Sequence, residues 1–182
     1  MAKVLIGSLV GAVLIFLWQF ASWTILDNHR PQQQYTPNQD TILAFLGKHI
    51  NGDAAFFLPT TSQNATREEM EATMKSSIGK PWAQVFYHKE MKDNMVMNMI
   101  RGFAINFVIV LLFILIMGKV TENSFTNVLL SSVGVGLIVF FNSPYTIHIW
   151  YETFDVWAHL FDAVVAWGLV GLWLGWWLNR GK

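Results

Sequence analysis

Five ionisable side chains in the C-terminal third of the chain follow one another at helical spacings: His148, Glu152, Asp155, His159 and Asp162. At about 100° per residue, these spacings place all five within an arc of about 80° on one continuous helix. We call these five residues the polar stripe. Imidazole and carboxylate groups bind divalent transition metals, and inside a membrane they also carry protons or ions. The polar stripe therefore indicates a metal site, a proton or ion pathway, or a structural hydrogen-bonded network.

Asp162 lies deepest in an apolar run. A charge at the centre of a membrane helix costs about 2.5–3.5 kcal/mol on insertion scales, so such a side chain is expected to face partners or water. One helix cannot surround a metal ion, and a metal site therefore needs ligands from another segment. Four residues outside the stripe are candidates: His29, His49, His88 and Glu90. Without them, we expect His159 to bond Asp155 or Asp162 within a structural network.

No catalytic signature accompanies the polar stripe. The sequence lacks the G-x-S-x-G, Walker, Rossmann and H-E-x-x-H motifs. It has no cysteine, which excludes disulfides, thiolate metal sites and cysteine nucleophiles. Twelve basic residues balance 12 acidic ones, so the chain shows no footprint for nucleic acid. These absences favour a protein that is not an enzyme. No cofactor is predicted, and a divalent metal at the stripe is the alternative.

The elements that must position the stripe are predicted to be membrane helices. Hydrophobic residues make up 53% of the chain and charged residues 13%, about half the charged share of soluble domains. Crossing the hydrocarbon layer takes about 20 apolar residues, and these must be helical because lipid offers no partner to backbone groups. Four runs qualify: 1–26, 102–118, 125–142 and 144–178. The predicted fold class is an all-α polytopic membrane protein.

The last run is predicted to be one long helix that begins outside the membrane. Ser143 and Pro144 supply a capping residue and a proline at the first helical position. A helix over 144–178 carries the polar stripe toward the bundle. Its opposite side is aromatic and is expected to face lipid: Trp150, Phe154, Trp157 and Phe161.

Residues 27–100 separate the first two spans and are predicted to form a small extracytoplasmic α+β cap. Thr36–Gln39 and Thr66–Glu69 have the composition of helix starts, each with a capping residue and Gln or Glu three positions later. Residues 54–58 and 82–87 resemble strands. The apolar content is too low for independent stability, so we expect the cap to rest on the membrane or on a partner.

Small residues spaced by four mark three of the four spans. The pairs are Gly7 and Gly11, Ser132 and Gly136, and Gly171 and Gly175. Such pairs let helix backbones approach closely, and they favour a tight bundle or self-association.

The distribution of basic residues predicts the orientation. Lys3, Lys119, Arg180 and Lys182 all fall on one side of the membrane, whereas the short loop 143–155 on the opposite side has neither Lys nor Arg. Short loops rich in Lys and Arg stay in the cytoplasm. Both termini are therefore predicted to be cytoplasmic, in the inner membrane of a bacterium.

The leading functional interpretation is a structural or accessory component of a larger membrane assembly. Its partners would be the lipid bilayer and either other membrane subunits or further copies of the chain. One alternative is a metal-binding protein or metal-dependent enzyme that uses the His148–Asp162 stripe. Another is a small ion- or proton-coupled carrier that uses His159 and Asp162.

Overall fold

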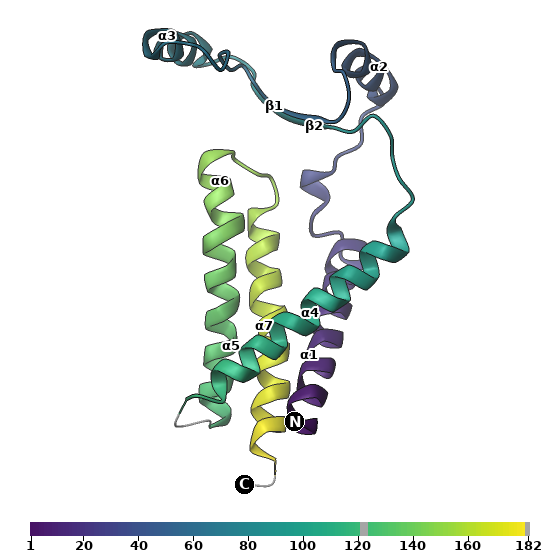
Figure 1. Cartoon of the computed structure of the whole chain (residues 1–182), viewed down its shortest axis with the longest axis vertical. Helices are drawn as coiled ribbons and strands as arrows, with labels where there is room; N and C mark the ends of the chain where they lie inside the picture. The colour runs from purple at the N-terminus through teal and green to yellow at the C-terminus, as the bar shows by residue number, and fades with distance from the viewer. Residues whose placement is uncertain (121–123, 181–182) are drawn as a thin grey trace. The chain divides into compact units, whose positions relative to one another are not determined.

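A computed structural model describes residues 1–120 and 124–180 of the chain (Figure 1). The chain divides into two compact units, a helical unit of Met1–Gln34 with Asn94–Lys182 and an αβ unit of Tyr35–Asp93. The αβ unit is shorter at both ends than the predicted cap of residues 27–100. The segments left out of the αβ unit, including residue His29, belong to the helical unit.

Four helical stretches within the described residues are long and apolar enough to cross a membrane: Ala2–Ile25, Met95–Met117, Phe125–Trp150 and Val156–Asn179. The first consists of α1 (Ala2–Phe20) followed by a π-helical turn (Ala21–Ile25). The second is α4 (Met95–Met117) and the fourth is α7 (Val156–Asn179). The chain is therefore mostly helical, as predicted, with four apolar helices and one small sheet.

The third stretch corrects the predicted single helix over 144–178. α5 (Phe125–Phe140) passes through a π-helical turn (Phe141–Tyr145) that contains the proline and continues into α6 (Thr146–Trp150). A helix of 16 residues such as α5 spans only about 24 Å, so it needs this extension to cross about 30 Å of hydrocarbon. The wider π turn tolerates a residue without a backbone N–H. The chain then leaves the helix and reverses direction before α7 begins.

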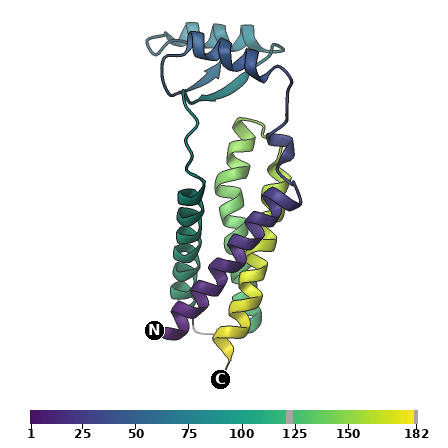
Figure 2. The same cartoon turned by 90° about the vertical axis from the view of Figure 1, so that its right-hand side faces the viewer.

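α7 is the central helix of the helical unit. It packs against α5 and against α1, and α1 in turn packs against α4. Figure 2 shows the start of α1 and the end of α7 at one end of this unit, and the α6–α7 connection at the other. The helices share one apolar core, whose buried members include Ile15, Val110, Phe113, Val128 and Leu174.

The small residues of α5 and α7 lie where these two helices cross. A Cβ atom placed on Gly136 would lie 2.6 Å from the backbone oxygen of Ala163. A Cβ atom on Gly171 would lie 2.9 Å from the Cβ atom of Ser132. A Cβ atom on Gly175 would lie 2.8 Å from an aromatic ring of α5. The two backbones are therefore closer than side chains at these positions would permit.

A similar close approach joins α1 to its neighbours. A Cβ atom on Gly11 would lie 2.7 Å from the side chain of Val110 on α4, and Gly7 lies against side chains of both α4 and α7. A polar contact also joins α1 and α4: Nδ2 of Asn106 donates a hydrogen bond to Oε1 of Gln19 at 2.9 Å. Hydrogen bonding between two polar side chains inside apolar helices helps to set how these helices align.

The αβ unit contains the predicted strands and the predicted capping box. β1 (Ala54–Leu58) pairs antiparallel with β2 (Ala83–Tyr87). α3 (Arg67–Ser77) begins with the capping box of Thr66 and Glu69, in which each side chain bonds the other's backbone N–H. α2 (Gln39–His49) begins two residues later than the sequence pattern predicts.

Just before β1, Asp53 ties the ends of this hairpin together. Its carboxylate accepts a hydrogen bond from the backbone N–H of Lys89 at 3.0 Å and contacts Nδ1 of His88 at 3.4 Å. The bond from the Lys89 backbone, followed by that with His88, lowers the pKa of Asp53 below its usual value.

The αβ unit has no core of its own. None of residues 35–93, all of which the structure describes, is buried. Large apolar side chains stand open to the surroundings, with Met74 exposed by 67%, Ile78 by 76% and Phe86 by 74%. A two-stranded sheet of this kind is at best marginally stable alone.

The crossing of α5 and α7 yields a prediction with a matched control on the same helix. Gly136→Ala should destabilise the chain by about 1–3 kcal/mol, because the new methyl group overpacks against backbone. Gly134→Ala should leave stability unchanged, because a Cβ atom there meets nothing within 4 Å. Thermal unfolding in detergent measures both. Equal stability of the two variants would mean that the helices are not held at this distance.

Candidate functional site

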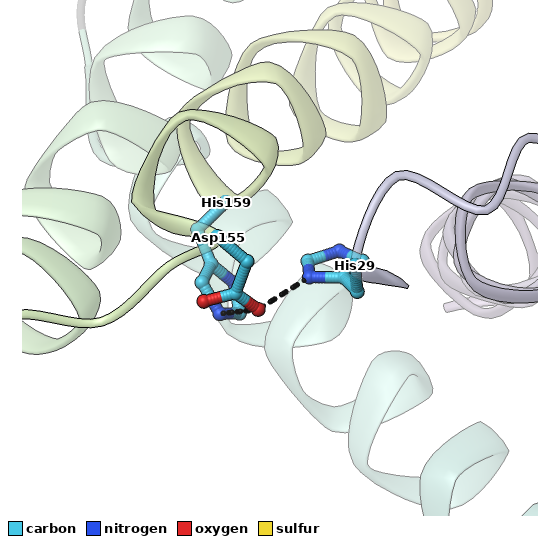
Figure 3. Close-up of side chains that lie close together, drawn as sticks. All are labelled: His29, Asp155 and His159. Carbon is cyan, nitrogen blue, oxygen red and sulfur yellow. Dashed lines mark hydrogen bonds and ion pairs between the residues drawn. The ribbon is translucent and has the colours of Figure 1, made fainter. Parts of the chain in front are cut away.

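Two segments far apart in the sequence meet at one end of the helical unit. After α1 and its π-helical turn, Asp27 adopts a left-handed backbone conformation with a φ of 55°, which turns the chain. This turn directs His29 toward the start of α7 (Figure 3). The segment is held there by Gln32, whose Oε1 accepts a hydrogen bond from the backbone N–H of Phe154 at 2.9 Å.

α7 supplies the other side of the site through three members of the polar stripe. Asp155 immediately precedes the helix, and its carbonyl oxygen accepts the backbone N–H of His159 at 3.1 Å. Asp162 follows one turn later. Spacings of four and three residues place these side chains on one face of the helix.

His29 bridges the two carboxylates. Its Nδ1 lies 2.8 Å from Oδ2 of Asp155, and its Nε2 lies 2.9 Å from Oδ2 of Asp162. His159 approaches the same oxygen of Asp155, with its Nε2 at 3.3 Å. Figure 3 shows the two contacts as dashed lines that meet at one oxygen of Asp155. Both contacts of His29 are hydrogen bonds donated by the ring only when each ring nitrogen carries a proton.

Asp162 is held by donors from α1 and its π-helical turn. Its Oδ1 accepts hydrogen bonds from Nε1 of Trp18 at 3.1 Å and from Oγ of Ser22 at 2.6 Å. Asn28 in turn donates from Nδ2 to Oγ of Ser22 at 3.1 Å. Both oxygens of Asp162 therefore have partners, and these contacts explain how an apolar helix accommodates this residue.

Burial of the site is uneven. The side chains of His29 and Asp155 are each 2% exposed, that of Asp162 is 16% exposed and that of His159 is 34% exposed. The indole of Trp23 stacks on the ring of His29, with a centroid distance of 3.9 Å and an interplanar angle of 6°. The site is thus closed around His29 and open beside His159.

One buried oxygen in the site lacks a partner. Among the residues that the structure describes, Oδ1 of Asp155 is buried without any hydrogen bond. Leaving a buried polar atom unpaired costs about 1–3 kcal/mol, and more for a charged group. Native proteins rarely leave such an atom unused, and an ion is one of the groups that can satisfy it.

The donor set has the composition of a transition-metal site. One ligand atom each from His29, Asp155 and His159 lies within 4.8 Å of the others. Two imidazoles and a carboxylate suit zinc or iron(II). Metal-bound histidines usually donate their second ring nitrogen to a carboxylate, and Asp162 stands at Nε2 of His29 in that position.

The structure separates two members of the predicted polar stripe from the other three. His148 lies on α6, where its Nδ1 accepts the backbone N–H of Thr153 at 3.1 Å. Glu152 is exposed in the α6–α7 connection. The stripe is divided because its residues belong to two helices, so the periodicity of one helix does not apply across the connection.

Of the additional ligand candidates, His29 joins the site. His49, His88 and Glu90 lie in the αβ unit. The contacts that Trp18, Ser22 and Trp23 make in the site were not predicted from the sequence. The signal for Ser22 was available, since it is one of few polar residues in the first apolar run and lies two helical turns before His29.

Comparisons of this chain with protein-family models, with curated proteins and with solved structures find no match.

The contacts of Asp162 predict a large loss of stability when its carboxylate is removed. Asp162→Ala should cost about 3 kcal/mol, because it leaves the donors of His29, Trp18 and Ser22 without a partner in an apolar setting. Glu152→Ala, in the exposed connection, should have no effect. Unfolding of the detergent-solubilised chain measures both. If the two variants are equally stable, the contact between Asp162 and His29 contributes nothing.

Proposed function

We propose that this chain is a multi-pass membrane protein that holds one divalent transition-metal ion between the end of α1 and the start of α7. The observation that carries the proposal is the convergence of His29 and His159 on Oδ2 of Asp155, whose other oxygen, Oδ1, is buried without a hydrogen bond. From the sequence, a metal site at the polar stripe requires a further ligand from a second segment of the chain. His29 is such a ligand.

Electrostatics favour a bound cation. Without a metal, two carboxylates face one bridging imidazole in a largely buried setting. A divalent ion with two neutral imidazoles balances the charges of Asp155 and Asp162 completely. Because an uncompensated charge in a low-dielectric site is costly, this balance stabilises the metal-bound form.

The identity of the metal follows from the donor atoms. The chain has no cysteine, so it offers no thiolate for copper(I) or an iron–sulfur cluster. Imidazole nitrogen and carboxylate oxygen together favour zinc or iron(II) over calcium and magnesium, which prefer oxygen ligands alone.

The proposed location is the inner membrane of a bacterium, with both termini in the cytoplasm and the αβ unit outside it. The helical unit supports this orientation, since the start of α1 and the end of α7 lie together. There, Nζ of Lys3 donates to the carbonyl oxygens of Leu178 and Arg180, both at 3.1 Å. Basic residues at one end of a helical unit favour the cytoplasmic side.

Reporter fusions test this orientation. Green fluorescent protein attached after Arg180 should fluoresce, because it folds in the cytoplasm. Alkaline phosphatase inserted after Ser62, between β1 and α3, should be active, because it requires an oxidising exterior. Activity of the phosphatase at Arg180 but not at Ser62 would reverse the proposed orientation.

Metal analysis of the purified chain tests the proposed function. After loading with zinc and removal of the excess, the chain in detergent should retain one metal ion per polypeptide. His29→Ala, Asp155→Asn and His159→Ala should each lose most of it. His148→Ala serves as the matched control, because its imidazole lies outside the donor group.

Helix content from circular dichroism distinguishes loss of ligand from loss of fold. Variants that keep their helices and lose the metal support the proposal. A folded chain without stoichiometric metal overturns it, as would full retention of metal by the folded His29→Ala variant.

A second candidate function rests on the αβ unit. Because residues 35–93 include no buried side chain, this unit gains stability by covering its apolar surface with another protein or with lipid. That favours a structural or accessory component of a larger membrane assembly. The chain purified in detergent for metal analysis also distinguishes the metal-binding function from the accessory role. A metal-free chain recovered with a second protein, which Phe86→Ser then releases, would favour the accessory role.

A further inference from the structure

The proposed metal centre has three protein donors, and no fourth His, Cys, Asp or Glu joins this group among residues 1–120 and 124–180. The three are Nδ1 of His29, a carboxylate oxygen of Asp155 and Nε2 of His159. Structural zinc sites use four protein ligands, whereas sites that bind an external ligand use three and leave the fourth position to water or substrate.

Asp162 does not complete the set, because both of its oxygens are engaged. One faces Nε2 of His29, and the other accepts the hydrogen bonds from Trp18 and Ser22. Turning this carboxylate toward a metal would leave an indole N–H and a hydroxyl group unpaired near the end of an apolar helix. Asp162 therefore orients His29 and does not act as a ligand.

His148 and Glu152, the two remaining members of the polar stripe, do not supply a fourth ligand either. Nδ1 of His148 accepts the backbone N–H of Thr153, which ties it to its own connection. Glu152 is exposed, and neither residue belongs to the group of convergent donor atoms.

The exposed fractions show on which side the fourth position lies. His29 is covered by the indole of Trp23 and is 2% exposed, as is Asp155. His159 is 34% exposed, and its ring lies 4.7 Å from that of His29 between centroids. The donor group is thus open beside His159 and covered around His29.

We infer that the metal ion keeps one exchangeable coordination position beside His159, which takes a small neutral molecule with an oxygen or nitrogen lone pair. The inference rests on the proposed function. A neutral ligand is favoured because Asp155 and Asp162 already balance the divalent ion, so an anion would add an uncompensated charge in a partly buried site. Water, an alcohol or a carbonyl compound meets this description.

This arrangement matches the ligand count of zinc sites that activate a bound water molecule or polarise a carbonyl oxygen. A closed site with four protein ligands stabilises the fold alone. An exchangeable position therefore distinguishes a reactive or ligand-sensing centre from a structural one.

Cobalt(II) spectroscopy on the full chain in detergent tests the inference, with imidazole as the neutral probe. Cobalt(II) replaces zinc in such sites, and its visible absorption depends on coordination number and ligand type. Imidazole should shift the visible bands of the cobalt-loaded chain in a saturable manner, with cobalt remaining bound after the probe is removed. The Glu152→Gln variant is the control and should respond in the same way.

Chemical rescue tests the position of the opening. His159→Ala should bind little cobalt alone and should recover most of it in millimolar imidazole, since the probe can occupy the place of the missing ring. His29→Ala should not recover, because Trp23 and α7 cover that place. Helix content measured in parallel shows whether each variant is folded.

The outcomes separate this inference from the function on which it rests. If the wild-type chain binds cobalt but imidazole does not shift its visible bands, the site is closed. That result overturns only the inference. Rescue of His29→Ala and not of His159→Ala also overturns it. A folded chain that binds no cobalt or zinc overturns the proposed function and the inference together.

Discussion

The bridge that His29 makes between Asp155 and Asp162 is the interaction on which this end of the helical unit depends. Two carboxylates at the start of an apolar helix are unfavourable unless donors or a cation compensate them. One imidazole, held at 2.8 and 2.9 Å from the two carboxylates, reaches both. The π-helical turn after α1 and the left-handed conformation of Asp27 bring the ring of His29 to this position. The indole of Trp23 stacks on the ring and shields it from one side.

α7 connects this polar site to the packing of the helical unit. At one end it holds the carboxylates, and along its length Gly171 and Gly175 allow α5 to approach closely. A helix fixed by close backbone contact on one side and by hydrogen bonds on another keeps its side chains in constant positions. Such rigidity is what a metal site requires of its supporting elements. The αβ unit contrasts with this, since none of its residues is buried.

A structural network and a metal centre use the same residues here, and the unpaired oxygen of Asp155 separates them. A network that evolved for stability alone would be expected to pair every buried polar atom, because a half-satisfied network is less stable than an apolar core. The unpaired oxygen therefore supports the metal ion that we propose. The orienting contact from Asp162 fits the same reading, since metal-binding imidazoles commonly rest on a second carboxylate.

The sequence by itself determined the four apolar helices, the two strands, the capping box at Thr66 and the common helix face of Asp155, His159 and Asp162. Each of these follows from local rules: run length, residue alternation, capping chemistry and helical spacing. Only the tertiary structure decided which residues complete the site. The predicted helix over 144–178 was wrong because the chain leaves α6 after Trp150 and begins a new helix, α7, at Val156. This interruption separates His148 and Glu152 from the site. The pairing of His29 with α7 joins positions 126 and 133 residues apart, and no local pattern encodes such a contact, because it depends on how whole helices pack.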